Sequence, residues 1–176
     1  MTKYIFASFN KNKLLEIDSK IRNIELISLT DMGYSDKIEE TGLTLEENAL
    51  IKSRTIYKKY SIPCLSDDTG LEVYSLNGRP GVFSARYASE VPNARKNMKK
   101  LLKEMENIQD RRARFRTVIC LKNHLEEKLF EGVVEGVIGN NIIGNKGFGY
   151  DSIFIPNGYR RTFAEISLES KNKISH

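Results

Sequence analysis

Three separated stretches of the sequence carry the residue types that would hold a polyphosphate, a divalent metal and a planar base. Residues 8–13 (Ser-Phe-Asn-Lys-Asn-Lys) offer amides and cations, residues 66–70 (Ser-Asp-Asp-Thr-Gly) offer carboxylates, and residues 147–151 (Gly-Phe-Gly-Tyr-Asp) offer an aromatic ring between glycines. Cations bind phosphate oxygens, Mg²⁺ prefers oxygen ligands, and bases stack on aromatic rings. Together the stretches predict a site for nucleotide hydrolysis.

The first stretch follows a strand-like run at residues 4–7 and precedes apolar residues at helical spacing. A helix N-terminus presents free N–H groups and the positive end of the helix dipole, which attract phosphate. Asn10 or Asn12 is a suitable N-cap, and Lys11 and Lys13 add charge. The glycines and the Lys-Ser/Thr pair of a Walker A loop are absent. Taken alone, the stretch is a polar helix start.

The acidic doublet Asp67-Asp68 would follow a short strand, where adjacent side chains point to opposite sides. One carboxylate would then enter a cleft while the other supports the loop. Mg²⁺ needs only one or two carboxylates beside substrate oxygens, and Glu39-Glu40 is a second source of them. One carboxylate would also accept a proton from the attacking water. The alternative is a plain turn in which Gly70 supplies a positive φ.

Glycines on both sides of Phe148 would let the backbone approach a ligand and expose the ring. A base stacked on that ring would gain roughly 1–3 kcal/mol. The alternative is a glycine-rich turn with Phe148 and Tyr150 in the core, and the sequence leaves both open. The polar tail at residues 169–176 is either a frayed helix or a source of donors to the edge of a base.

The elements that would position these residues alternate in type along the chain. Strands are predicted at residues 4–7, 24–29, 64–66, 71–74, 114–121 and 129–138, and helices at 13–22, 46–60 and 92–106. Residues 67–70 are predicted as a turn, 77–78 as a hairpin turn, and 122–128 as a loop joining antiparallel strands. The first strand, helix and strand predict a parallel pair. The whole chain, 1–176, is therefore predicted to be one α/β domain with a mixed, partly antiparallel sheet.

The 28 basic and 23 acidic residues give a net charge of +5, which favours anionic partners. Arg112, Arg114 and Arg116 would share one strand face, and a solvated face is favoured over a nucleic-acid patch. Cys64 and Cys120 lie in apolar runs and are predicted to be buried and free. No apolar run would span a membrane and no signal peptide is visible, so the cytoplasm is expected.

The sequence resembles the inosine triphosphate pyrophosphatase family, which acts on non-standard purine nucleoside triphosphates. The matching segments run nearly end to end: residues 7–13, 39–42, 47–49, 66–73, 78–87, 147–151, 162–165 and 171–176. The resemblance implies an elongated α/β fold with two lobes around a substrate cleft, and a homodimer. It implies Mg²⁺-assisted hydrolysis of ITP, dITP or XTP to the monophosphate and pyrophosphate.

The resemblance also implies roles for individual residues. Asp68 would be the general base and, with Glu39 and possibly Glu40, a metal ligand. The residues expected to bind substrate are Ser8, Phe9, Asn10, Lys11, Asn12, Lys13, Thr69, Phe148, Gly149, Tyr150, Asp151, Lys171 and His176. Lys13 would be the leading phosphate cation, Phe148 would stack on the purine, and Lys171 would suit the 6-oxo group of hypoxanthine or xanthine.

Two departures from the family pattern qualify this expectation. The family has Thr-Gly where this chain has Ser8-Phe9, and the family's Ser-His-Arg and final helix would follow where the chain stops at His176. The lost glycine is expected to alter how closely the loop approaches phosphate. Without the arginine and the final helix, base selectivity and the dimer contact are expected to be weaker. Two other functions stay open: a pyrimidine-directed (UTP or dTTP) pyrophosphatase of the same architecture, and a non-catalytic nucleotide- or RNA-binding module. The module ranks last because the acidic residues would repel a nucleic-acid backbone.

Overall fold

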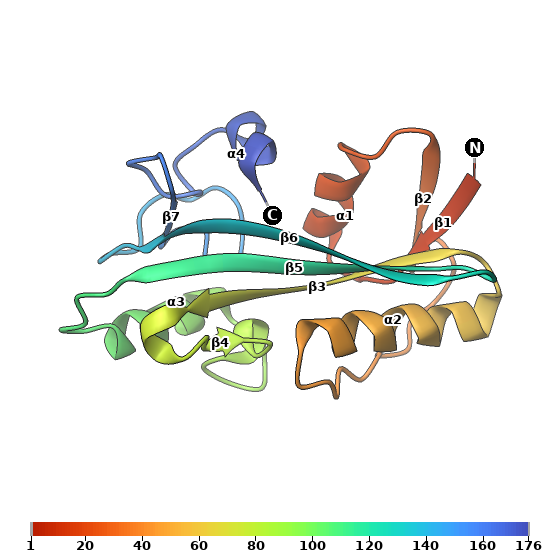
Figure 1. Cartoon of the computed structure of the whole chain (residues 1–176), viewed down its shortest axis with the longest axis horizontal. Coiled ribbons are helices and arrows are strands. Elements are labelled where there is room, and N and C mark those ends of the chain that lie inside the picture. The colour runs from red at the N-terminus through yellow and green to blue at the C-terminus, as the bar shows by residue number, and fades with distance from the viewer. Residues whose placement is uncertain (1, 176) are drawn as a thin grey trace. The chain divides into compact units, whose positions relative to one another are not determined.

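The computed structural model describes residues 2–175 and shows a mixed α/β fold (Figure 1). The elements in chain order are β1 (Thr2–Phe6), α1 (Lys11–Asp18), β2 (Ile24–Ser28), α2 (Leu45–Tyr60), β3 (Cys64–Val73), η1 (Tyr74–Leu76), β4 (Pro80–Gly81), η2 (Ser84–Arg86), α3 (Ala94–Glu104), β5 (Arg112–Lys122), β6 (Glu127–Ile138), β7 (Phe154–Pro156) and α4 (Leu168–Ile174). The sheet has the order β2-β1-β3-β5-β6-β7, with β4 beside β3. Parallel pairing of β1 with β2 and antiparallel pairing of β6 with β7 confirm the predicted mixed sheet.

The chain divides into two compact units. Unit 1 comprises Met1–Asp68 and Val118–Glu131, and unit 2 comprises Thr69–Thr117 and Gly132–His176. The division passes through β3, β5 and β6, so each long strand contributes one part to each unit. The first two of the chemically interesting stretches fall almost entirely in unit 1, and the third falls in unit 2.

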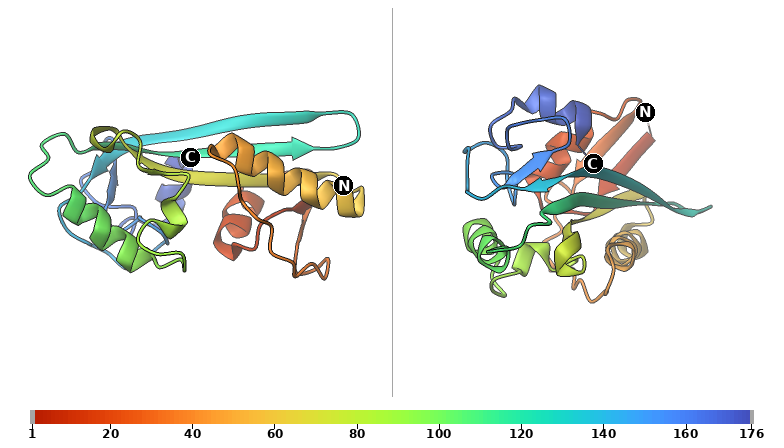
Figure 2. Two further views of the ribbon diagram at one scale, coloured as in Figure 1. Left: turned by 90° about the horizontal axis from the view of Figure 1, so that it is seen from below. Right: turned by 60° about the vertical axis from the view of Figure 1, so that its left-hand side comes forward.

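Unit 1 is built on the predicted strand, helix and strand at the N-terminus. β1 and β2 pair in parallel, and β1 also pairs in parallel with the first residues of β3. Helices α1 and α2 lie on opposite faces of these strands (Figure 2). The core contains Ile5 from β1, Ala7 just after it, Leu29, Ile56 from α2, and Cys64 from β3. This packing brings the carboxyl ends of β1 and of the unit 1 part of β3 together, which is where open α/β sheets bind ligands.

Local sequence explains where the unit 1 helices begin and end. α1 begins at Lys11, two residues before the predicted start, because the Asn10 side chain caps it. It ends at Asp18 rather than at Arg22, and Asn23 takes a positive φ of 70° before β2. In α2 the Thr44 hydroxyl accepts the Glu47 N–H and caps the helix, which begins at Leu45, one residue before the predicted start.

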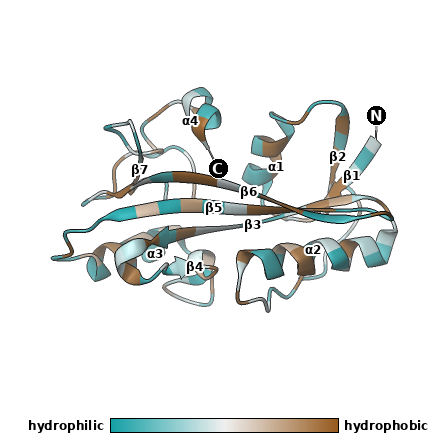
Figure 3. Cartoon of the chain, viewed as in Figure 1, coloured by the Kyte–Doolittle hydropathy of each residue, from teal (hydrophilic) through white to brown (hydrophobic). Residues whose placement is uncertain are grey.

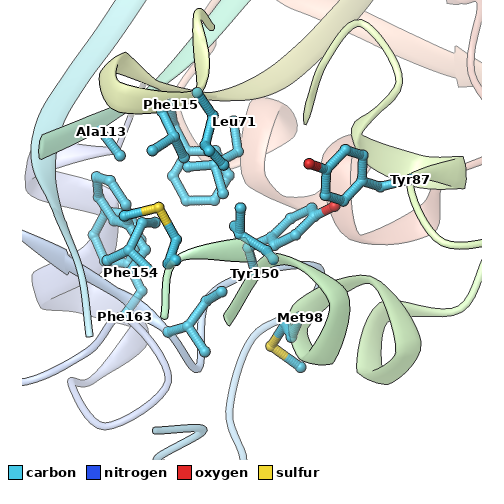
Figure 4. Packing of buried hydrophobic residues seen from close by; sticks show 14 of the residues in the cluster. Leu71, Tyr87, Met98, Ala113, Phe115, Tyr150, Phe154 and Phe163 are labelled. Carbon is cyan, nitrogen blue, oxygen red and sulfur yellow. The ribbon is translucent and has the colours of Figure 1, made fainter. Parts of the chain in front are cut away.

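Unit 2 packs its strands around an aromatic core (Figure 4). Phe115 of β5 meets Phe154 of β7 edge to face, with ring centroids 4.7 Å apart, and Phe163 stacks behind them. Leu101 and Met105 close the core from α3 and the residue after it. Helices α3 and α4 lie on opposite faces of the unit 2 strands (Figure 1). This core supports the loop at residues 147–151.

The predicted acidic turn at residues 67–70 is wrong, because β3 runs without interruption from Cys64 to Val73. Gly70 does not supply a positive φ. A Cβ at Gly70 would instead lie 2.6 Å from the Gly81 carbonyl oxygen, so this glycine allows β4 to approach β3 closely. Asp67 and Asp68 therefore sit within a strand and point to opposite sides of the sheet. The hairpin turn at Asn77-Gly78 is confirmed, with φ values of 54° and 79°.

The arginines of β5 are held by acidic partners within unit 2. Arg112 binds Asp110 at 2.8 Å, and Arg114 binds Glu72 at 2.7 Å. The strongly hydrophilic start of β5 is visible in Figure 3. Two of the three arginines that share this strand face therefore have acidic partners within the protein.

The two cysteines are buried and free, as predicted. Burial raises the pKa of the Cys64 thiol to about 12 and also raises the pKa of Cys120.

Among residues 2–175 no helix combines the length and apolar character needed to cross a membrane.

We expect neither thiol to react with a maleimide in the native protein at pH 8, because both are buried and held as thiols. Both should react promptly in concentrated urea, and mass spectrometry would count the adducts. The raised pKa also makes the free energy of unfolding depend on pH. The stabilisation from keeping Cys64 as a thiol is fully present below pH 9.0, the ordinary pKa, and is lost as the pH rises toward about 12. Fast labelling of the native protein at pH 8 would contradict this burial.

Candidate functional site

The loop from Ser8 to Asn10 leaves the carboxyl end of β1 and leads into α1. The Asn10 side chain accepts the Asn12 N–H at 3.0 Å and the Lys13 N–H at 3.4 Å, while the Ser8 hydroxyl accepts the Asn10 N–H at 3.2 Å. Lys11 and Asn12 are exposed on the first turn. The predicted geometry, a strand turning into a capped helix start, is therefore confirmed.

Lys13 joins this loop to the acidic strand. Its ammonium group forms an ion pair with the Asp67 carboxylate. The Asp67 side chain is only 3% exposed and the Lys13 side chain 19% exposed, so the pair is largely removed from water. The cation of the first stretch and one carboxylate of the second thus lie together within unit 1.

Asp68, on the other side of β3, is buried and bound by two side chains of α2. Its Oδ1 lies 3.1 Å from Lys52 Nζ, and its Oδ2 accepts the Asn48 amide at 3.2 Å. Lys52 also donates to Glu40 Oε1 at 2.8 Å. Asn48 and Lys52 are four residues apart, so they project from one face of the helix. One ammonium group therefore lies between two carboxylates.

The electrostatics of this cluster favour Asp68 as a proton acceptor. Burial raises the pKa of Asp68, Lys52 acts to lower it, and Glu40 adds to the increase. For Lys52, burial acts to lower the pKa, but the nearby carboxylates, Asp68 first, raise it overall. Lys52 therefore keeps its charge, and Asp68 holds a proton more tightly than an ordinary aspartate. Both properties are typical of catalytic sites.

Sequence reasoning assigned no role to Asn48 or Lys52. A lysine within an amphipathic helix looks like any solvated charge, and nothing local marks it as buried. The available signal was the i, i+4 spacing of two polar residues on the helix that precedes the acidic strand. Glu39, the predicted metal ligand, is 68% exposed in its side chain and pairs with Lys37 at 3.1 Å. Glu40 is the member of that doublet that meets the Asp68 cluster.

The loop at residues 147–151 in unit 2 is organised around the Asp151 carboxylate. Asp151 Oδ2 accepts the Phe148 N–H at 2.9 Å and the Lys171 ammonium at 2.8 Å. Gly147 and Gly149 have φ values of 73° and 61°, and a side chain at Gly147 would overlap the Asp151 carboxylate. The Lys171 ammonium lies 4.7 Å from the centroid of the half-buried Phe148 ring. Phe148, Asp151 and Lys171 therefore form one group, and their role toward a base stays a prediction.

Tyr150 lies in the core, which is one of the two positions that the sequence left open for it. Its ring is buried, as Figure 4 shows, and its hydroxyl donates to the Ser84 carbonyl at 2.8 Å. It anchors the loop to the segment that contains η2. Thr69, in unit 2, places its hydroxyl 2.6 Å from that of Thr117. His176 lies outside the described residues. The binding roles of these residues stay predictions.

We expect Lys171→Met to destabilise the protein by about 3–5 kcal/mol, because the buried Asp151 carboxylate would lose its cation. Urea unfolding at pH 7 measures this change. Lys173→Met is the matched control, since the Lys173 side chain is 70% exposed and its pair with Glu169 lies at the surface. Equal stability of the two variants would contradict the buried pair.

The sequence of this chain is similar to a family model and to known proteins over nearly its whole length. The Ham1 family model matches residues 4–176. A dITP/XTP pyrophosphatase of Flavobacterium psychrophilum is 53% identical over 173 residues, covering 98% of this chain and 91% of that protein. A dITP/XTP pyrophosphatase of Bacillus licheniformis is 47% identical over 182 residues, covering 100% and 92%.

Solved structures agree with the sequence comparison. The Staphylococcus aureus Ham1 protein has a TM-score of 0.91 at 39% identity, covering 99% of this chain and 92% of that one. A HAM1 protein from Coxiella burnetii has the same score and identity, covering 100% and 92%. The match of a family model over nearly all residues, with relatives close to half identical, shows that this chain belongs to the Ham1 family.

Proposed function

We propose that this protein hydrolyses the non-standard purine nucleoside triphosphates ITP, dITP and XTP to the monophosphate and pyrophosphate, which removes them from the nucleotide pool. The observation that carries the proposal is the buried Asp68 with its raised pKa, held by Lys52 and Asn48 in unit 1. A carboxylate of this kind is suited to take a proton from water. The relatives named dITP/XTP pyrophosphatase support the same reaction.

In the proposed reaction Asp68 accepts a proton from the water that attacks the α-phosphorus. The bond to the bridging oxygen then breaks, and pyrophosphate leaves with the electron pair. Lys13 and Lys52 would stabilise the negative charge that develops on the phosphate oxygens. Lys13 is held by Asp67 and Lys52 by Asp68, two consecutive residues of β3, so both cations are already fixed within unit 1. Ser8 and the start of α1 would orient the phosphate chain.

The donor set around Asp68 fits Mg²⁺. Glu40 and Asp68 both lie within 3.1 Å of the Lys52 ammonium, so two carboxylates converge on one point. Within residues 2–175 no group of three or more His, Cys, Asp or Glu side chains is placed to hold a metal alone. Mg²⁺ is commonly held by one or two carboxylates plus substrate phosphates, and when bound it would neutralise phosphate charge. Asp68 with Glu40 or Glu39 would hold it.

Phe148 would stack on the purine, and Lys171 would donate a hydrogen bond to the 6-oxo group of the base. Asp151 holds the Lys171 ammonium at 2.8 Å and so fixes its direction. Adenine presents an amino group at the same place, which a lysine ammonium cannot use as an acceptor. With adenine bound, the Lys171 ammonium would lack this acceptor, and the cost of a polar group without a partner is what discriminates against the wrong base. We also propose a cytoplasmic location and, as the resemblance implies, a homodimer, which sedimentation velocity would test.

The function is tested by measuring pyrophosphate release from ITP, dITP, XTP, ATP, GTP and UTP, with Mg²⁺ and with a chelator. We expect fast release from ITP, dITP and XTP that requires Mg²⁺ and is lost with the chelator. Faster release from UTP would favour the pyrimidine-directed alternative. Absence of release from every nucleotide would overturn the proposal.

A further inference from the structure

The N-terminal end of α1 is held in place by few contacts. No residue of this eight-residue helix is buried. Two side-chain contacts tie the N-terminal end to the rest of unit 1: the Lys13–Asp67 ion pair, and the Phe9 ring, which stacks on Tyr34. The centroids of these rings are 6.1 Å apart and the planes differ by 26°, within the range of favourable aromatic pairs. The ring of Phe9 therefore packs against the protein, although the side chain is half exposed.

Tyr34 is a fixed support for this contact. It is 5% exposed, and its N–H donates to the Leu29 carbonyl at 2.9 Å. Its ring meets Tyr60 of α2 edge to face at 6.3 Å, and the Lys59 ammonium lies 4.5 Å from its centroid. A continuous row of rings thus links the loop before α1 to α2, the helix that carries Lys52.

The loop that Phe9 anchors still has open hydrogen-bond donors. The N–H groups of Ser8, Asn10, Asn12 and Lys13 have acceptors within unit 1. Among residues 2–175 the N–H groups of Phe9 and Lys11 have none. Open donors at a helix start are suited to an anion. The backbone of Phe9 therefore presents a donor whose position depends on its own ring.

We propose that Phe9 is a positioning residue for the triphosphate chain: its stack on Tyr34 holds the Phe9 and Lys11 amides and the Lys13 side chain where phosphate oxygens bind. This inference rests on the proposed function, and it gives the Phe9 ring a supporting role rather than contact with the base. Removing the ring would let the loop move and weaken phosphate binding. It would leave Asp68 and Lys52 in place, so the loss should fall mainly on phosphate binding.

The test compares Phe9→Ala with Phe9→Tyr, which keeps the ring, and with Tyr34→Leu, which removes the support but keeps an apolar side chain. Leu15→Ala is the matched control, because Leu15 is a 68% exposed apolar residue on the same helix. The KM and kcat for ITP are measured for each. Calorimetry gives the Kd of inorganic tripolyphosphate, which has no base and needs no hydrolysis.

For Phe9→Ala we expect the KM for ITP and the Kd of tripolyphosphate to rise together by roughly 2- to 10-fold, the worth of such an aromatic pair. The kcat should change by a smaller factor than the KM, because Asp68 and Lys52 stay in place. Phe9→Tyr and Leu15→Ala should match the wild type. The double variant Phe9→Ala/Tyr34→Leu should bind tripolyphosphate no more weakly than the poorer binder of the two single variants, because both substitutions remove the same ring contact.

Three results would overturn the proposal: unchanged tripolyphosphate binding in Phe9→Ala, an equal loss in Phe9→Tyr, or additive losses in the double variant. The calorimetric experiment separates this inference from the proposed function. A wild-type protein that binds tripolyphosphate but releases no pyrophosphate from ITP would refute the function. The comparison of Phe9→Ala with Phe9→Tyr would still decide the role of the ring.

Discussion

Asp68→Asn is expected to lower kcat for ITP by roughly 10²- to 10⁴-fold, the range that a positioned general base contributes. The asparagine keeps the volume of the aspartate and still offers an oxygen to Asn48 or Lys52, but it cannot take a proton from water. Because burial raises the pKa of Asp68, the native carboxylate carries a desolvation cost that the neutral amide avoids. The fold should therefore remain intact, with a melting temperature close to that of the wild type.

The matched control is Asp36→Asn. Asp36 is 70% exposed in its side chain and pairs with the surface residue Lys59 at 3.2 Å. The same chemical change there should leave kcat and KM unaltered. Steady-state kinetics with circular dichroism on both variants makes the comparison. Turnover by Asp68→Asn within a few-fold of wild type would remove Asp68 from the role of base.

The fold was predictable from the sequence where periodicity and local chemistry agree. The parallel pair of β1 and β2, helices α2 and α3, and the hairpin turn at Asn77-Gly78 all follow from local signals. The turn predicted at residues 67–70 failed because Asp-Asp-x-Gly is a turn signal only when the glycine takes a positive φ. Gly70 instead makes room for Gly81, a residue eleven positions away, and no local pattern shows that contact.

The site was predictable to the extent that its residues form motifs. The capped start of α1 and the loop with Phe148 and Asp151 were found in this way, whereas Lys171 was assigned only through the resemblance to the family. Lys52 was missed because its importance comes from burial beside Asp68, which depends on how α2 packs against β3. Tyr150 was ambiguous for the same reason: an aromatic residue between a glycine and an aspartate suits a ligand site and a core equally well. Tertiary packing decides such cases.

Lys52→Met is expected to affect stability, rate and pH dependence together, because Lys52 is the cation shared by two carboxylates. Loss of a buried partner costs about 3–5 kcal/mol, measured as the free energy of unfolding in urea. The kcat for ITP should also fall, because one of two cations near the phosphates is removed. Lys58→Met is the matched control, since Lys58 lies on the exposed face of the same helix.

The pH dependence gives this prediction its most specific form. The base must be ionised, so kcat/KM falls as the pH drops through the pKa of Asp68, which burial already raises. Lys52 lowers that pKa, so its removal should move the acid limb of the profile to higher pH. Glu40 raises the pKa, so Glu40→Gln should move the limb to lower pH. Opposite shifts cannot arise from general destabilisation, which would change both variants in the same direction. Shifts of one sign would mean that Asp68 does not set the acid limb.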